Sequence, residues 1–563
     1  MAEIIPDSTI TLLFDVPLQN NYENTFYFIS RNEQRNWFFN YYRKVEFNQQ
    51  SYQRKNKGWL RLSARYRDVY NANYMYFMNN WRTQTPSVPE MVYEQKDFYA
   101  FITQVDYIND MTVEIHYEID VLQTYMFDWQ FQDTFIERET VESDNLGEHI
   151  IDEGLPIGDY VNNKISELYF NTTAGQQSLT TKYFLVAATF NYDAVTDTFT
   201  DLSDGDPTNQ IVSGMPVGCK YFTFNSAQAT IDFLNKIPGE KISGVLSVNV
   251  IPFLAAQAIT LSQGYGNWSA NIDKSQFFSE NHSLDGYIPE NNKLQCYPYN
   301  FMLIESGDGN SREFAYEHFK SGTILFLLNM ICSLPIQGML FPAEYKTVQS
   351  NDPVLAISYA LYLPPTATCT FSTDTFKAWY ALNSGFITTE RISAISDLVI
   401  DNASAILGAA RASLSSTGDM YLSELGSARG ITGDYQRLAN TYYTVRNAKR
   451  APDAINGSAN NQLIMMNNQY KFMHVNRCIR SDYAKSLDKY FKMFGYKVNT
   501  VKHPYLTNRT RFTYLKTVNM DIGGEIPQDD KNKICEIFNK GVRWWLDIAT
   551  IGDYTSPNPV RSA

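Results

Sequence analysis

Three side chains that could support metal binding or acid–base chemistry alternate along one short stretch: His116, Glu118 and Asp120. On an extended strand, side chains that share a face lie about 6.6–7 Å apart. Ligands of one transition metal must lie within about 2.0–2.3 Å of the ion. Two neighbours could bend toward one ion, but all three would need other elements to help. A solvated strand face is therefore the favoured interpretation, and a metal site is the alternative.

The other patterns that could support catalysis are weak. None of the six histidines lies in an HExxH spacing, and no G-x-S-x-G elbow or P-loop occurs. Asp152 and Glu153 could serve a glycosidase, but adjacent residues usually point apart, which favours an acidic loop. The basic residues of 485–516 could touch DNA phosphate or dock on an acidic neighbour. We therefore expect a protein without enzyme activity, cofactor or metal.

The composition indicates a large, acidic, mainly β protein. A chain of 563 residues is too long for one compact core, and 44% hydrophobic with 19% charged residues is a globular composition. The 39 Tyr and 35 Phe favour pleated, half-buried surfaces. A net charge of −13 argues against a protein that grips nucleic acid, although DNA could pass a surface that must not hold it. The six scattered cysteines contain no CxxC and indicate buried free thiols, and the first ten residues show no secretory signal.

Short strands are expected in the first 135 residues, and 113–121 is the clearest case. Strict alternation is typical of a strand with one buried face and one solvated face. The residues expected on the buried face are Val113, Ile115, Tyr117, Ile119 and Val121, and those on the solvated face are Glu114, His116, Glu118 and Asp120.

Farther along the chain, the uncharged segment 321–342 is long enough to span a bilayer. Its central Pro335 and its polar residues favour two buried strands with a turn over a transmembrane helix. Asp308-Gly309, between two strand-like runs, predicts a hairpin. Helices are expected at 227–237, at 483–495 with Gly495 as the cap, and at 530–546.

The character of the chain changes after about residue 375. The segment 391–414 carries apolar residues at three- and four-residue steps, which predicts an amphipathic helix. Small residues dominate 402–430, and the chain stays polar to 476. A long, partly helical insertion inside a β protein is the simplest interpretation.

Motifs at both ends of the chain resemble one viral family. The early motifs are DVPLQNNYENTFYF, VYNANYMYFM, FYAFITQVDYIN, EIDVLQTYMFDWQFQDTFIERE and IDEGL. Later motifs are KLQCYPYNFMLIE, SLDKYFKMFGYKVNTVKHPYLTNRTRFTYL and EIFNKGVRWWLDIATIGDYT. Together they resemble the tail knob, or distal tail tube, protein of small short-tailed bacteriophages of the Picovirinae type. The resemblance covers the first 160 residues, the last 90 and a patch near residue 300.

The resemblance implies a structural protein of the virion, located at the phage tail tip, with a mainly β (α+β) fold. It implies tail-tube-like β-barrel domains assembled into a homo-hexameric ring, with an inserted domain and a long, partly helical loop. Double-stranded genome DNA would leave through the channel without sequence-specific binding, and a proximal tail tube or lower collar protein would be the docking partner.

The family's luminal plug loop, which meets the host membrane after its release, falls by position at 384–476 of this chain. Charged residues interrupt this segment, and each costs a few kcal/mol in lipid, so a plug is favoured over spontaneous membrane insertion. These charged residues are Asp397, Asp401, Arg411, Asp419, Glu424, Arg429 and Arg437. The apolar plug residues are expected to be Ile392, Ile395, Val399, Ile406, Leu407 and Leu414.

The resemblance also implies a domain order and a channel wall. We expect 1–140 as the first part of a β tube domain, 141–290 as an inserted or second domain, 291–383 as the continuation of the tube, 384–476 as the plug loop and 477–563 as the α/β segment that completes the tube. Glu118 and Asp120 are the expected channel-lining acids, because rings of acid would repel DNA phosphate at short range.

Two alternative functions stay open at this stage. One is a tail-associated enzyme that degrades cell-wall glycans with a carboxylate pair, and the other is a receptor-binding tail protein. Glycan cleavage would support the first, and cell binding by the isolated protein would support the second.

Overall fold

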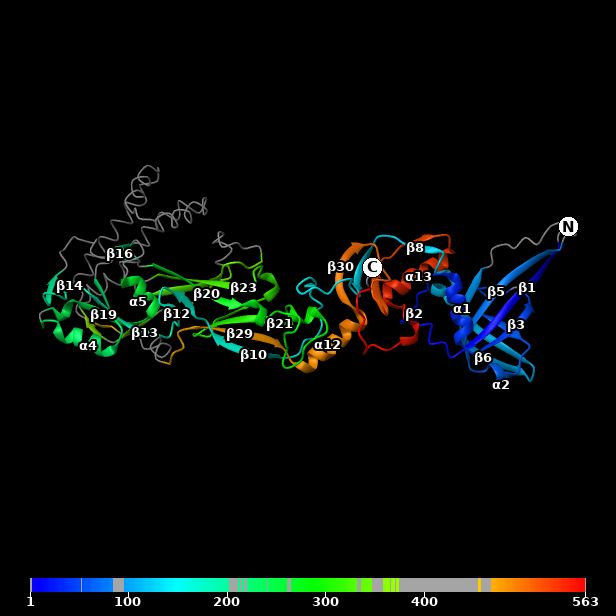
Figure 1. Cartoon of the computed structure of the whole chain (residues 1–563), viewed down its shortest axis with the longest axis horizontal. Coiled ribbons are helices and arrows are strands. Elements are labelled where there is room, and N and C mark those ends of the chain that lie inside the picture. Colours follow the sequence, from blue (N-terminus) through cyan, green and yellow to red (C-terminus); the bar gives the residue numbers. More distant parts are fainter. Residues whose placement is uncertain are drawn as a thin grey trace, which may run out of the picture. The chain divides into compact units, whose positions relative to one another are not determined.

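The computed structural model contains two units, and β-strands dominate both (Figure 1). Unit 1 comprises Met1–Ile157, Pro289–Leu294 and Ser481–Ala563, and unit 2 comprises Gly158–Ile288 and Gln295–Arg480. The structure describes residues 3–51, 53–84, 96–201, 211–212, 215–216, 220–239, 241–260, 265–331, 336–346, 358–364, 366–369, 371–373, 454–456 and 467–561.

A six-stranded antiparallel sheet forms the N-terminal part of unit 1. In spatial order its strands are β3 (Lys44–Gln50), β1 (Glu3–Phe14), β5 (Ala72–Gln84), β6 (Asp97–Asn109), β7 (Thr112–Ile119) and β4 (Trp59–Leu62). The aromatic and β-branched residues of β5 and β6 suit a pleated surface that is buried on at least one face.

A second sheet of unit 1 combines strands from both ends of the chain. Its order is β2 (Asn24–Phe26), β33 (Val542–Trp545), β31 (Phe512–Val518), β9 (Thr134–Glu139) and β30 (Tyr496–Lys502), and a separate pair joins β8 (Trp129–Phe131) to β32 (Ile522–Gly524). The helices of unit 1 are α1 (Arg31–Tyr41), α2 (Tyr66–Val69), α3 (Val121–Tyr125), α12 (Ser481–Phe494) and α13 (Gln528–Lys540).

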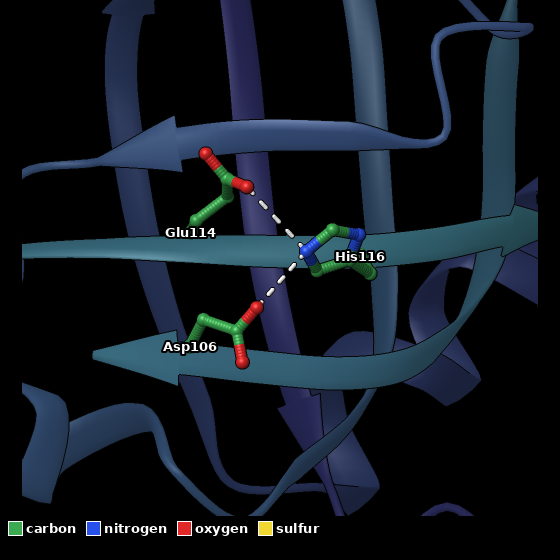
Figure 2. Close-up of side chains that lie close together, drawn as sticks. All are labelled: Asp106, Glu114 and His116. Carbon is green, nitrogen blue, oxygen red and sulfur yellow. Dashed lines mark hydrogen bonds and ion pairs between the residues drawn. The ribbon is translucent and has the colours of Figure 1, made fainter. Parts of the chain in front are cut away.

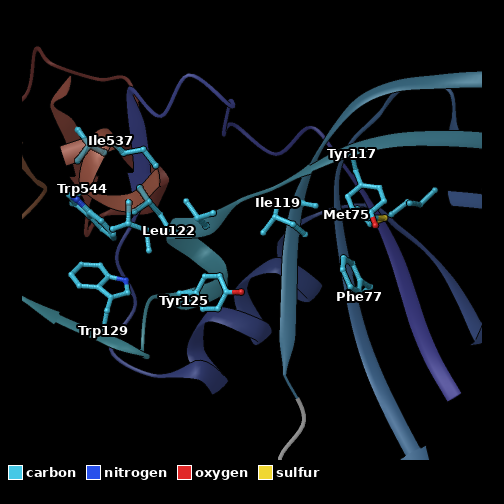
Figure 3. Packing of buried hydrophobic residues seen from close by; sticks show 14 of the residues in the cluster. Met75, Phe77, Tyr117, Ile119, Leu122, Tyr125, Trp129, Ile537 and Trp544 are labelled. Carbon is cyan, nitrogen blue, oxygen red and sulfur yellow. The ribbon is translucent and has the colours of Figure 1, made fainter. Parts of the chain in front are cut away.

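The main core of unit 1 joins the first sheet to the C-terminal segment. Leu122 of α3 packs in one cluster with Ile537 of α13 and Trp544 of β33, and Figure 3 shows these side chains between the elements. Trp544 is fully buried and stacks on Phe538, with ring centroids 5.8 Å apart. Because burying a large apolar side chain contributes about 1.5–3 kcal/mol, these contacts tie the two chain ends into one folded body.

The described residues of unit 2 form three larger sheets. The first has the order β10 (Tyr160–Glu167), β29 (Phe472–Ile479), β21 (Asn300–Ser306), β22 (Ser311–Phe314). The second has the order β12 (Gly175–Gln177), β11 (Phe170–Thr172), β20 (Tyr265–Asp273), β23 (Thr323–Ile331), β24 (Gln337–Pro342), β25 (Leu361–Tyr362). The third has the order β18 (Lys220–Phe224), β13 (Lys182–Ala188), β19 (Val245–Pro252), β26 (Ala367–Cys369).

The described part of unit 2 also contains smaller elements. Strand pairs join β14 (Phe190–Asp193) to β15 (Thr198–Asp201), β16 (Ile211–Val212) to β17 (Met215–Pro216), and β27 (Phe371–Thr373) to β28 (Ala454–Asn456). Among the described residues of unit 2, the α-helices are α4 (Ala227–Lys236) and α5 (Phe253–Thr260).

Most elements expected from the sequence are present. The segment 321–342 forms the paired strands β23 and β24, so the two-strand interpretation is confirmed. In the part of the chain that is described, no helix is long and apolar enough to cross a membrane. The hairpin at Asp308-Gly309 and the helices α4 and α12 are confirmed, and Gly495 follows α12 at φ 64°. Cys296 and Cys478 are buried thiols without a disulfide to another described residue.

One expectation about a helix boundary needs correction. The last helix ends at Lys540, not at residue 546, because Gly541 turns the chain at φ 98° and the following residues form β33. The expected continuation of the tube domain over 291–383 stays a prediction. Strand β21 pairs with β29 and β22, so from Gln295 onward this part belongs to unit 2.

Candidate functional site

The solvent-facing side of β7 carries the side chains that the sequence singled out. Val113, Ile115 and Tyr117 are buried, whereas Glu114 and His116 are half-buried and Glu118 is exposed. The predicted alternation is therefore confirmed along β7. The neighbouring strand β6 adds further polar side chains to this face.

Three side chains with ligand atoms converge on this face. Figure 2 shows Asp106 of β6 and Glu114 of β7 pointing toward the ring of His116. His116 Nε2 lies 3.1 Å from Asp106 Oδ2 and 3.4 Å from Glu114 Oε1. Each of the three side chains offers one ligand atom within 4.8 Å of the other two. The cluster can hold a cation, or it can share a proton between the imidazole and the carboxylates.

Sequence reasoning placed His116 correctly on the solvated face but did not find Asp106. The nearest signal in the sequence is the turn-forming pair Asn109-Asp110, which precedes the strand pattern of 113–121. In the structure Asn109 pairs with Thr112, and a register shift between Tyr107 and Asn109 sets Asp106 directly opposite Glu114. Counting back from the turn without this shift would have placed Asp106 opposite Ile115, so the turn alone does not bring the two carboxylates together.

Glu118, one of the two expected channel-lining acids, is exposed. Its carboxylate lies 3.5 Å from Lys533 Nζ of α13, and both side chains are about half exposed, at 45% and 53%. An exposed ion pair of this kind contributes about 0–1 kcal/mol to stability. Glu118 therefore stays available to solvent on this face.

Asp120, the second expected acid, lies in the interior, so its expected place on the solvated face is wrong. It is 1% exposed, because β7 ends at Ile119 and Asp120 begins α3. Its carboxylate accepts hydrogen bonds from Gln123 N at 3.1 Å and from the Tyr74 hydroxyl at 2.8 Å. Burial raises its pKa to about 7, and these two hydrogen bonds oppose the shift. The D-x-x-Q spacing of Asp120 and Gln123 is the helix-start signal that could have revealed this role.

The paired carboxylates Asp152 and Glu153 point apart, as expected. Asp152 is exposed, whereas Glu153 is buried in ion pairs with Arg138 and Lys293. The two carboxylates therefore do not share a site, and Glu153 joins three separated segments of unit 1.

Three lysines of the basic segment 485–516 have acidic neighbours. Lys502 Nζ lies 2.6 Å from Glu139, Lys516 Nζ lies 2.9 Å from Glu137, and Lys492 Nζ lies 2.7 Å from Glu290, in each case measured to a carboxylate oxygen. For these lysines, docking on an acidic neighbour is therefore the better interpretation than contact with DNA phosphate.

The expected plug residues lie outside the described residues. They are Ile392, Ile395, Val399, Ile406, Leu407 and Leu414. Their role stays a prediction.

Comparisons with known proteins point to one group. The sequence profile of the family described as Bacillus phage phi29, Tail knob protein gp9, C-terminal domain, matches residues 264–559. The profile described as Caudoviral major tail protein N-terminus matches residues 6–130, which include most of the first sheet.

Relatives match along the whole chain. The tail knob protein gp9 of Bacillus phage PZA is 25% identical and the alignment covers 98% of this chain and 99% of the relative. Its counterpart from Bacillus phage phi29 is 24% identical over the same shares. The structure of the bacteriophage C1 tail knob protein, gp12, is similar in fold, with a TM-score of 0.58, 14% identity, and coverage of 98% of this chain and 100% of that one.

Proposed function

The chain belongs to the family of phi29-type tail knob proteins, and from this premise we propose that six copies form the distal tube of a short phage tail, through which double-stranded genome DNA leaves. We further propose that a loop near 384–476 closes this tube before infection. The observation that carries the proposal is the match to tail knob proteins along the full length of both chains.

The protein is a structural component of the virion tail and not an enzyme, because its relatives are named as tail knob proteins. As a tail component it assembles with other tail proteins. We propose that the direct neighbour is the proximal tail tube or lower collar protein.

The edges of the first sheet support assembly into a ring. Strands β3 and β4 lie at the two ends of the sheet, and most residues of β3 are exposed or half-buried. An edge strand presents backbone groups that can pair with another chain, and closing a ring satisfies such edges. Subunits placed side by side through these edges would form a continuous wall.

The charge of the chain supports a channel that does not hold DNA. Six chains at −13 each carry −78 in total, so the assembly as a whole repels phosphate. At physiological salt the electrostatic repulsion acts over about 8 Å. A DNA duplex that passes close to the channel wall would come within this distance. Glu118 is our candidate for the lumen, because it is the exposed acid of β7. Asp120 lies in the interior at the end of β7, so we do not propose it as a residue of the channel wall.

The proposed plug rests on the sequence of 384–476. Its proposed plug residues are apolar and include Ile392, Ile395 and Val399. Packed together in the lumen, such side chains would exclude water and block passage. Contact of this loop with the host membrane after release is part of the same proposal.

The oligomeric state of two purified proteins, the full chain and a variant without residues 384–476, tests the tube and the plug together. Light scattering gives the mass, and particle imaging gives the shape and the density in the lumen. A hexameric ring that is blocked only in the full chain is the expected result. The control is the Glu118→Lys variant of the full chain, which keeps the loop and should keep the hexamer.

Two results would contradict the proposal. A lumen that stays blocked after the deletion would show that residues 384–476 do not form the plug. Monomers in both proteins, together with binding of the purified chain to host cells, would favour the receptor-binding alternative.

A further inference from the structure

We propose that Asp106, Glu114 and His116 bind one divalent transition-metal ion on the β6–β7 hairpin, with zinc as the best match. This inference rests on the geometry of the hairpin alone and does not depend on the tube or the plug. The ion would link two neighbouring strands on the solvent side of the first sheet.

The distances fit the first coordination shell of a tetrahedral ion. Two ligand atoms that each lie about 2.0–2.1 Å from a tetrahedral zinc are separated by about 3.3 Å. The separations from His116 Nε2 are 3.1 Å to Asp106 Oδ2 and 3.4 Å to Glu114 Oε1. These two values lie on either side of the expected separation. Small movements of the side chains would therefore bring both pairs of atoms to the separation that a tetrahedral ion requires.

The backbone register explains how the three side chains meet. Glu114 and His116 share one face of β7, and Asp106 lies directly opposite Glu114 on β6. A single strand spaces its side chains too widely for three ligands, but the cross-strand pair supplies the third. The neighbouring pair on this face joins Gln104 to His116.

Each carboxylate is oriented by a second contact that leaves one oxygen for the ion. Gln104 Nε2 donates to Asp106 Oδ1 at 2.6 Å, and Arg61 Nε donates to Glu114 Oε2 at 2.7 Å. The other oxygen of each carboxylate is the one that faces His116. Outer partners of this kind fix ligand orientation in metal sites, and their loss typically costs about 10–100-fold in affinity.

The ligand set selects the class of ion. One imidazole nitrogen with two carboxylate oxygens suits zinc and similar transition metals, whereas calcium and magnesium prefer oxygen ligands alone. The His116, Asp106 and Glu114 side chains are 36%, 38% and 17% exposed, so an ion can enter from solvent. Three protein ligands leave a fourth position for water.

A protonated imidazole between two carboxylates is the competing explanation of the same contacts. One Nε2–H donates well to only one acceptor, yet two carboxylate oxygens from different strands converge on this nitrogen. A divalent ion between them relieves the repulsion of both carboxylates at once. The two explanations differ in their response to metal.

Calorimetric titration of the full chain with zinc chloride, after removal of metal by a chelator, distinguishes them. One zinc ion per chain is the expected result, and cobalt(II) should give the visible absorption of a four-coordinate site. His116→Gln and Asp106→Asn should each weaken zinc binding by more than about tenfold, and Gln104→Ala by about tenfold. Magnesium chloride at the same concentration should give no binding isotherm.

Matched controls separate this site from general binding by acids and histidines. Glu118→Gln removes the next acid on the same strand face, and His503→Gln removes a histidine elsewhere in unit 1. Both should bind zinc like the unchanged chain. Equal zinc binding by the unchanged chain, His116→Gln and Asp106→Asn would overturn the proposal, and so would the absence of any zinc binding by the unchanged chain. Circular dichroism without metal checks that each variant is folded.

Discussion

Replacing Asp120 by Asn should stabilise unit 1 at pH 8 and leave its stability at pH 4 nearly unchanged. The Asp120 carboxylate is buried at the start of α3, where it accepts from Gln123 N and from the Tyr74 hydroxyl. The amide oxygen of Asn can accept one of these hydrogen bonds and remains a good helix cap. The substitution therefore removes the negative charge while disturbing the packing little.

The magnitude follows from the pKa of the Asp120 carboxyl, which burial raises from 3.8 to about 7. A raised pKa means that the folded state holds a proton that the unfolded state releases between these two pH values. The associated stability is fully present below pH 3.8 and is lost as the pH rises through about 7. Because one pKa unit corresponds to about 1.4 kcal/mol, the loss amounts to about 4 kcal/mol.

Denaturant unfolding followed by tryptophan fluorescence at pH 4, 5, 6, 7 and 8 measures the difference between the variant and the unchanged chain. Comparing the two proteins at each pH cancels the contributions of all other titrating groups. The difference in unfolding free energy should grow from near zero to about 4 kcal/mol in favour of the variant. Glu118→Gln, which removes an exposed charge two residues away, is the control. A difference that stays constant from pH 4 to pH 8, or an unchanged chain that is the more stable one at pH 8, would refute the reasoning.

Three further substitutions test other contacts of unit 1 by the same unfolding assay. Leu122→Ala empties a fully buried site in the core and should cost about 2–5 kcal/mol. Gly495→Ala should cost more than about 2 kcal/mol, because Gly495 has φ +64° and a Cβ would lie 1.8 Å from the Glu139 carbonyl oxygen. Glu153→Ala removes the buried carboxylate that forms ion pairs with Arg138 and Lys293 and should cost about 3–5 kcal/mol.

Each of these substitutions has a matched control. Ile29→Ala changes a side chain that is 74% exposed and should alter the unfolding free energy by less than about 0.5 kcal/mol. A Cβ added at Gly309 would have no other atom within 4 Å, so only the backbone at φ +90° disfavours an alanine there. Gly309→Ala should therefore lower the unfolding free energy by about 1–2 kcal/mol. Glu137→Ala breaks a half-buried pair with Lys516, which stays in contact with solvent, and should cost about 0–1 kcal/mol. If a control substitution lowered the unfolding free energy as much as the substitution it is matched to, the contact assigned to the matched residue would be contradicted.

The sequence predicted local structure well where one pattern dominated. The alternation along β7 followed from the side-chain period, and the paired strands β23 and β24 followed from the expectation that Pro335 separates two strands. The start of α3 was missed because Asp120 continues the alternation numerically while its side chain caps a helix. The D-x-x-Q signal was present, but it competed with a longer strand pattern.

The candidate site was only half predictable, because it depends on register between strands. His116 and Glu114 were visible on one strand, but Asp106 joins them only through the β6–β7 pairing. The assignment of β21 to unit 2 is a stronger case. Its partner β29 lies more than 160 residues later, and no local pattern specifies such a pairing.

The shared core of the two chain ends has a consequence for how the protein is made. On the ribosome, the strands of the first sheet emerge long before Ile537 and Trp544, which complete the cluster around Leu122. All of unit 2 is synthesised in between and can fold first, as domains generally do during translation. A chain that stops early would display an unfinished apolar surface, which invites aggregation or chaperone capture. Only full-length copies would then reach assembly competence, so the order of synthesis itself would screen incomplete subunits from the virion.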